Sequence, residues 1–190
     1  NLFERVASLY IHSNHISPAI EYNRLAYKVA DDMDNDKLRA LAKINEAKLW
    51  FFSDIDKSYN IMQEAKFYLA KKNVPRIDCH NELGLLTAEM VLTKCNESVI
   101  KTYILRADEL LKKSIEIDYP LDIIRSHFLL AVLYFYGKDR ALAMSKKHIE
   151  AGIDASVRYG ILKLVGNFYN LKALIAIEEK QNIEYIMNRS

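Results

Sequence analysis

The sequence has few of the residues that interrupt regular structure, since only 5 of its 190 residues are glycine and 3 are proline. A β-rich fold needs many tight turns, and tight turns depend on glycine and proline. Long stretches with apolar residues three and four positions apart run between the few interruptions, which is the spacing of helices. The composition therefore predicts an all-α fold, and 51% hydrophobic residues are enough to bury a core.

Long apolar runs are missing as well. No stretch approaches the roughly 20 apolar residues that cross a bilayer as a helix, and the N-terminus lacks the basic-then-apolar pattern of a secretory signal. We therefore expect no membrane association and a cytoplasmic location. Charge is nearly balanced, with 27 lysines and arginines against 25 acidic residues. Because nucleic acids attract positive charge gathered on one face, this even mixture predicts no direct nucleic-acid binding.

Residue groups that carry chemistry are scarce. Cys79 and Cys95 are too far apart in sequence for a metal-binding or redox pair. Cys79 and His80 are adjacent, so on one helix their side chains point about 100° apart, and no second ligand follows at three or four residues. The chain also lacks a glycine-rich phosphate loop and the short motifs of hydrolases and metalloproteases. We therefore expect no enzyme, no bound metal and no cofactor.

The clearest internal pattern lies in residues 3–26. Bulky and small residues alternate there at helical spacing, and they do so again after a polar break. The small residues are informative because two helix axes approach closely only where no bulky side chain intervenes. The residues are Phe3, Val6, Ala7 and Tyr10 before the break, and Ala19, Asn23 and Ala26 after it.

This pattern resembles the tetratricopeptide repeat, a pair of antiparallel helices with small residues where the helices touch. Asn23 departs from it, because an aromatic residue is usual at that place. Later matches include Leu83 with Gly84. Only the last interval between the small residues that anchor the second helices equals the usual 34 residues, so the units are irregular. Those anchors are Ala19, Ser58, Ala107 and Ala141.

The resemblance implies a right-handed α-solenoid of antiparallel helix pairs. We expect a single helical-repeat domain over 1–190, cut from a longer protein, with nine helices and a partial tenth that begins at Ile183. Asp54 should cap a helix, Pro75 should begin one, and Gly137 should end one in the left-handed conformation. The nine helices are expected at about 2–13, 16–33, 38–52, 55–72, 75–94, 97–117, 120–137, 139–158 and 160–180.

The first helix of each pair lines the concave surface of tetratricopeptide arrays, so the resemblance also suggests binding residues. Asparagine amides on three successive first helices could clamp the backbone of an extended peptide, and aromatic rings could hold its side chains. The alternative is that these asparagines face water and these rings pack between repeats. The candidates are Asn45, Asn81 and Asn170 for the clamp, Phe128 and Phe135 for the apolar contacts, and His12 at a groove position of the first repeat.

Two functions follow from the resemblance. The favoured one is a scaffold that binds a protein or peptide, or associates with itself, as the sensor or interaction arm of a larger bacterial regulatory protein in signalling or transcription. The alternative is a structural spacer or an autoinhibitory lid that packs against effector domains of its own chain. An open groove, with Asn81, Phe128 and Phe135 partly accessible, would favour the first.

Overall fold

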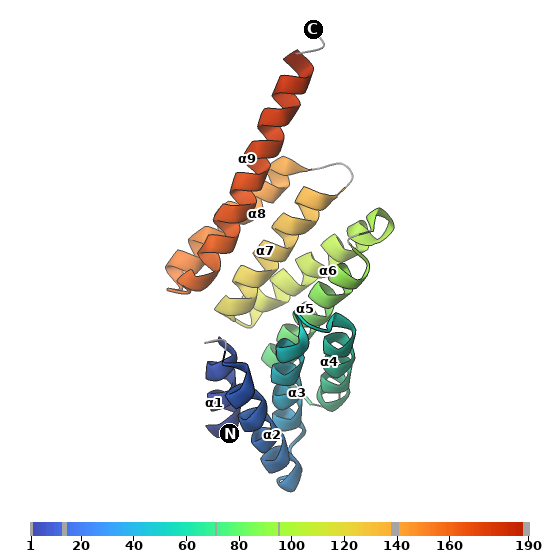
Figure 1. Ribbon diagram of the computed structural model, residues 1–190, viewed down its shortest axis with the longest axis vertical. Helices are drawn as coiled ribbons and strands as arrows, with labels where there is room; N and C mark the ends of the chain where they lie inside the picture. The colour runs from blue at the N-terminus through green and yellow to red at the C-terminus, as the bar shows by residue number, and fades with distance from the viewer. Residues whose placement is uncertain (1, 13–14, 71, 95, 138–140, 188–190) are drawn as a thin grey trace. The chain divides into compact units, whose positions relative to one another are not determined.

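A computed structural model describes the chain except residues 1, 13–14, 71, 95, 138–140 and 188–190, and except the side chains of residues 4, 8, 12 and 181–187. The described residues form nine α-helices and one short 3₁₀ helix, with no strand among them, which confirms the all-α prediction (Figure 1). The helices are α1 Leu2–His12, α2 Ile16–Asp32, α3 Asp36–Trp50, α4 Ile55–Leu69, α5 Pro75–Leu92, α6 Glu97–Glu116, α7 Pro120–Tyr136, α8 Leu142–Arg158, η1 Leu162–Leu164 and α9 Val165–Met187.

Local sequence signals set most helix starts. Asn35 and Asp54 each accept a hydrogen bond from the backbone N–H three residues later, at 3.1 and 2.9 Å, so each satisfies a donor that the first helical turn leaves open. Pro75 and Pro120 are the first residues of α5 and α7, where the missing N–H costs no hydrogen bond. The predicted roles of Asp54 and Pro75 are confirmed.

Three predicted details in the C-terminal half of the chain are wrong. Gly137 ends α7 in extended backbone, with φ −62° and ψ 150°, and not in the left-handed conformation. Ala141 is the residue before α8 begins, and Ser145, one turn later, is the buried anchor. No tenth helix starts at Ile183, because α9 continues to Met187. The polar residues 180–182 include neither glycine nor proline and so do not end a helix.

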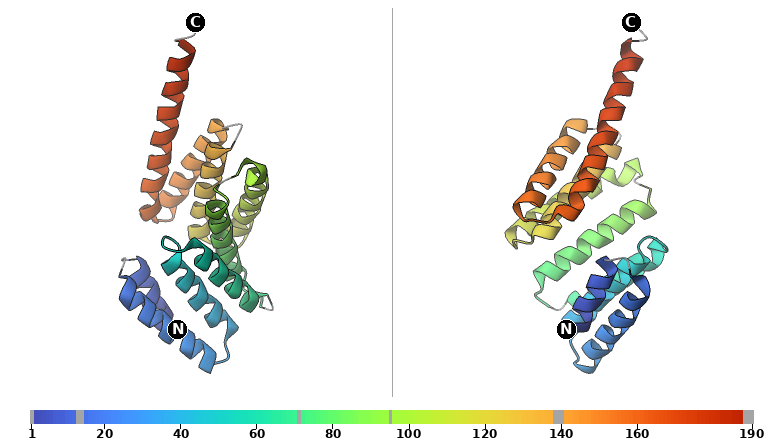
Figure 2. Two further views of the ribbon diagram at one scale, coloured as in Figure 1. Left: turned by 45° about the vertical axis from the view of Figure 1, so that its right-hand side comes forward. Right: turned by 60° about the vertical axis from the view of Figure 1, so that its left-hand side comes forward.

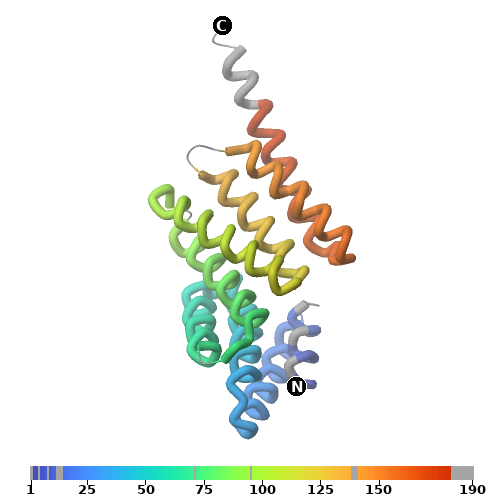
Figure 3. Tube along the Cα trace, turned by 180° about the vertical axis from the view of Figure 1, so that it is seen from behind, coloured from blue at the N-terminus to red at the C-terminus, as the bar shows by residue number. Residues whose placement is uncertain are grey.

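The chain divides into two compact units, Asn1–Lys94 and Cys95–Ser190, where the sequence predicts one domain. In the first unit each helix packs against the next, and α1 also contacts α3, as α3 contacts α5. The odd-numbered helices therefore form one layer and the even-numbered helices another (Figure 2). In the second unit α6, α7, α8 and α9 follow in the same way, and α7 contacts α9 (Figure 3). The right-handed sense of the superhelix stays a prediction.

The repeat appears in the structure as a fixed series of buried positions on three even-numbered helices. Each helix buries residues at intervals of four, three and four, so one stripe faces the neighbouring helices. The first position of each series is Ala or Ser, which lets the helices approach closely. The series are Ala19, Asn23, Ala26 and Ala30 in α2, Ser58, Met62, Ala65 and Leu69 in α4, and Ser145, Ile149, Gly152 and Ser156 in α8.

The two serines that open these series make the same bond in the two units. Ser58 Oγ of α4 donates to the carbonyl of Ala47 in α3 at 2.8 Å, and Ser145 Oγ of α8 donates to the carbonyl of Ala131 in α7 at 2.7 Å. Both serines are fully buried, so each hydroxyl needs a partner inside the protein. The α3–α4 and α7–α8 pairs are therefore joined by the same kind of buried contact.

Candidate functional site

Two of the three predicted clamp asparagines lie inside the first unit. Asn81 is only 1% exposed, and its Nδ2 donates to the carbonyl of Met62 at 3.0 Å, which connects α5 to α4. Asn45 is also buried in α3. Asn170 is exposed on α9 in the second unit. The expected accessibility of Asn81 is therefore wrong, because its amide binds a helix carbonyl where a peptide backbone was expected.

Asn23 shows that this use of asparagine is a structural device. Its Nδ2 donates to the carbonyl of Ala42 at 3.0 Å and connects α2 to α3, as Asn81 connects α5 to α4. A helix carbonyl has a second lone pair that can accept such a bond. The departure of Asn23 from the repeat pattern thus has a physical reason, since an aromatic side chain at that place could not make this bond.

The predicted aromatic contacts are partly accessible, as expected. Phe128 is half-buried on α7 and lies edge-on against Phe168 of α9, with ring centroids 5.4 Å apart. Phe135 is half-buried against Tyr136, at 4.9 Å. Phe128 therefore contributes to packing between α7 and α9. The side chain of His12 lies outside the described residues.

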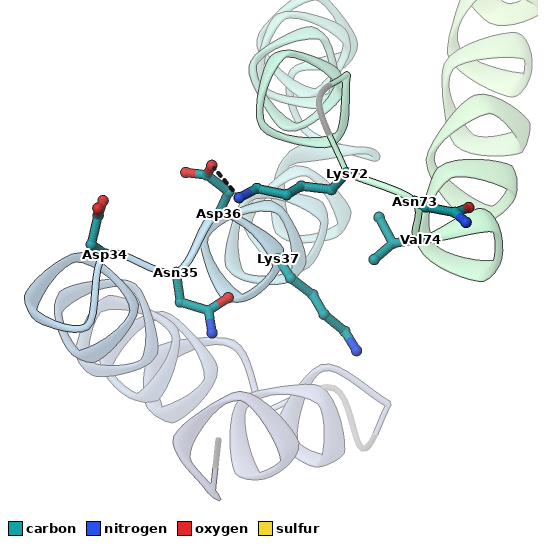
Figure 4. Close-up of a pocket in the computed structure, with 7 residues that line it drawn as sticks. All are labelled: Asp34, Asn35, Asp36, Lys37, Lys72, Asn73 and Val74. Carbon is teal, nitrogen blue, oxygen red and sulfur yellow. Dashed lines mark ion pairs between the residues drawn. The ribbon is translucent and has the colours of Figure 1, made fainter.

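One end of the first unit carries charge. The α2–α3 and α4–α5 connections meet there around an open hollow of about 340 Å³ (Figure 4). Lys72 crosses it to pair with Asp36, at 3.5 Å. Arg39 is surrounded by Asp31, Asp34 and Asp36 at 2.8 to 2.9 Å. The lining residues are Asp34, Asn35, Asp36, Lys37, Lys72, Asn73 and Val74.

The charges at this end largely neutralise one another. Arg39 lowers the pKa of Asp36, and the neighbouring acids raise the pKa of Arg39. Each of these groups therefore stays charged and engaged near neutral pH. Exposed ion pairs of this kind contribute little individually. The Lys72–Asp36 pair joins the two connections. The hollow itself offers no strong net charge to a ligand.

The opposite end of the first unit is aromatic. Consecutive helices are antiparallel, so the α3–α4 connection lies away from the charged end. Phe52, in the α3–α4 connection, is 97% exposed, and its ring lies edge-on to Phe51 at 5.3 Å. The ammonium of Lys57 lies 3.3 Å from the centre of the Trp50 ring, a cation–π contact that holds the indole.

Further apolar side chains are exposed at this end. Tyr59 donates to Glu89 at 3.5 Å, which places the end of α5 beside the start of α4. The nearby Val91 is half exposed. We call this surface the aromatic end. It consists of Trp50, Phe51 and Phe52, with Val91 of α5.

The sequence prediction missed Phe52, because it placed this residue inside a helix over 38–52. The helix α3 ends at Trp50, and Phe52 lies in the turn that follows. The cap at Asp54 could not reveal this, because it requires only that the preceding helix end before residue 54.

The described residues hold no group of three or more histidine, cysteine or acidic side chains placed to bind a metal. Within the same part of the chain, no helix combines the length and the apolar character that a membrane span requires. Comparison with protein-family models, with curated proteins and with solved structures gives no match. The resemblance to the tetratricopeptide repeat therefore stays a prediction that rests on the residues.

Proposed function

We propose that this chain is a helical-repeat scaffold that binds a protein partner through the aromatic end of its first unit. The observation that carries the proposal is the 97% exposure of Phe52. Burying a phenylalanine side chain releases about 1.5 to 3 kcal/mol. Aromatic residues that a partner can enclose are the side chains that most often dominate binding energy.

The base beneath Phe52 supports this role. Phe51 and Trp50 pack against a buried cluster that joins three helices, α3, α4 and α5. Phe52 therefore projects from a well-packed support, and binding would order few additional groups. The members of the cluster are Ala47, Ile61, Met62 and Leu85.

The chemistry of the surface defines the partner. Phe52 requires an apolar pocket, and the exposed Asp54 and Asp56 beside it favour basic side chains at the pocket rim. A folded protein offers such a pocket more readily than an extended peptide, and two of the three clamp candidates, Asn45 and Asn81, are buried and cannot reach a peptide backbone. The roles in bacterial signalling or transcription and the cytoplasmic location remain expectations from the sequence.

The experiment uses a matched pair of phenylalanines. Phe52 lies at the aromatic end, whereas Phe67, 75% exposed, lies near the opposite end of α4. A photo-crosslinking amino acid at each position in the native cell should capture a partner from position 52 and not from position 67. With that partner purified, Phe52→Ala should weaken binding about tenfold or more, a loss of about 1.4 kcal/mol, with an unchanged melting temperature.

Phe67→Ala should bind like the wild type. Equal affinities for the two variants would contradict the proposal. If position 52 crosslinks only to other parts of the same polypeptide, the surface serves an internal contact, and the chain acts as a spacer or an autoinhibitory lid.

A further inference from the structure

In the second unit, α7 and α8 are joined by direct contact between two imidazole rings. The Nδ1 atoms of His127 and His148 are 3.1 Å apart, and the ring centroids are 5.4 Å apart. Both side chains are half-buried. Tyr134 stacks on His148 with nearly parallel rings, 5.6 Å apart. The contact is therefore fixed from α7 on more than one side.

This contact tolerates only one proton between the two Nδ1 atoms. A neutral imidazole either donates or accepts at Nδ1, so one ring donates its N–H and the other accepts with its lone pair. If both rings become protonated, both Nδ1 atoms are donors, and two positive charges face each other at the same short distance. The hydrogen bond is then lost and replaced by repulsion.

The surroundings oppose protonation of the pair. Burial, reinforced by the charge on His148, lowers the pKa of His127 from 6.5 to about 4. Burial and the charge of Lys147 lower the pKa of His148, and Asp108 of α6 acts in the opposite direction. Asp108 is itself paired with Lys112, at 2.7 Å. The carboxylate that acts on His148 is therefore already engaged.

An acid of α9 that reaches α8 is engaged too. Glu179 binds Lys146 of α8 at 2.6 Å. On α7, Arg125 acts on Lys163 of η1, whose pKa is lowered by burial and by the charge of Arg125. A proton that reaches the pair therefore finds positive neighbours and no uncommitted carboxylate among the groups that act on it.

We propose that the His127–His148 contact makes the second unit acid-sensitive, so that mild acidification separates α7 from α8 while the first unit stays folded. An unfolded histidine takes up a proton near pH 6.5, whereas folded His127 resists protonation down to about pH 4. Between these values the unfolded state binds more protons, so stability is fully present above pH 6.5 and is lost as the pH falls toward 4.

The size of the effect follows from the difference between the unfolded and the folded pKa of His127. For His127 alone, the unfolding equilibrium constant at pH 5 should be about 30-fold larger than at pH 8. Because His127 and His148 both lie in the second unit, the destabilisation falls on that unit. A pH-dependent opening of α7 from α8 would also release α9, which packs against both.

The only tryptophan in the sequence, Trp50, reports on the first unit. Urea unfolding followed by far-UV circular dichroism should show a transition that moves to lower urea as the pH falls from 8 to 5, with Trp50 emission changing only at higher urea. Hydrogen exchange should rise first in α7 and α8. A common shift of both signals, or no shift, would overturn the proposal.

Two further measurements isolate the pair. In the double variant His127→Phe with His148→Phe, two rings that cannot titrate replace the imidazoles, so the about 30-fold pH effect should disappear. The exposed His15 of the first unit serves as the control, since the His15→Gln variant should keep the pH effect of the wild type. If the double variant does not fold, the proposal is tested on the wild type by measuring the pKa of each histidine from its ring signals in NMR spectra. A pKa near 6.5 for both His127 and His148 would overturn the proposal.

Discussion

Replacing Gly152 with alanine is expected to destabilise the second unit by about 3 kcal/mol or more. Gly152 is buried in α8, and a Cβ atom built on it would penetrate the ring of Phe168 in α9. Phe168 is completely buried and is held edge-on by Phe128, so its ring has no space to retreat. The extra methyl group must therefore push α8 away from α9.

Alanine also has a higher helix propensity than glycine, by about 1 kcal/mol, so the packing cost must exceed this gain before any loss is measured. Gly166 in α9 isolates the propensity effect, because a Cβ there meets nothing within 4 Å. Gly166→Ala should leave stability unchanged or raise it. Gly84→Ala should cost little, since the atom it meets at 2.9 Å is the flexible thioether sulfur of Met62.

Urea unfolding of the three variants, followed by circular dichroism, measures these differences. Adding Phe168→Leu to Gly152→Ala should recover part of the loss, because the smaller side chain makes room for the methyl group. Free energies of unfolding for Gly152→Ala and Gly166→Ala that agree within about 0.5 kcal/mol would show that α8 and α9 do not depend on this close approach.

Gly152 also illustrates what the sequence could predict. The periodicity of α8 was visible, and so was the need for small residues where helices touch. The predicted series began at Ala141, one turn before the true start at Ser145. A shift of one turn assigns the contact to other residues of α8, so Gly152 was not recognised. A Cβ atom at Gly152 would meet its neighbour more closely than one at Gly84.

Helix starts were predictable because their causes are local. A proline at the first position or a capping carboxylate acts within one turn, and Pro75 and Asp54 therefore fixed the boundaries of α5 and α4. The orientation of a side chain depends instead on a neighbour distant in sequence. Asparagine is a residue type that is mostly found at the surface. The hydrogen bond to the carbonyl of Met62 explains why Asn81 is buried.

The second large effect is expected for Asn81→Asp, which should destabilise the first unit by about 3 kcal/mol or more at neutral pH. The amide of Asn81 donates to Met62, whereas a carboxylate has no proton to donate and would face the carbonyl oxygen with negative charge. The side chain is 1% exposed, so water cannot solvate that charge. The oxygen of the Asn81 amide, Oδ1, has no hydrogen-bond partner among the described residues, so no neighbouring donor is in place to stabilise a carboxylate there.

The cost should depend on pH in a defined direction. Burial disfavours the charged form, so the pKa of the new carboxyl should be raised in the folded state. Protonation restores a donor toward Met62, and the unit carrying Asn81→Asp should therefore gain stability as the pH falls from 7 toward 5. The second unit is expected to respond in the opposite direction over the same range, through His127 and His148, so each unit serves as a reference for the other.

Asn170→Asp is the matched control, because Asn170 is exposed on α9 and its carboxylate would stay in water. Trp50 emission in urea follows the unit that contains Asn81, and circular dichroism follows both units. The peptide-clamp hypothesis expects Asn81 variants to lose a ligand and keep their stability, whereas the bond to Met62 requires the stability itself to fall. Equal midpoints for Asn81→Asp and Asn170→Asp would show that the Asn81 amide does not help to hold α5 against α4. The peptide clamp would then again be the best explanation for this asparagine.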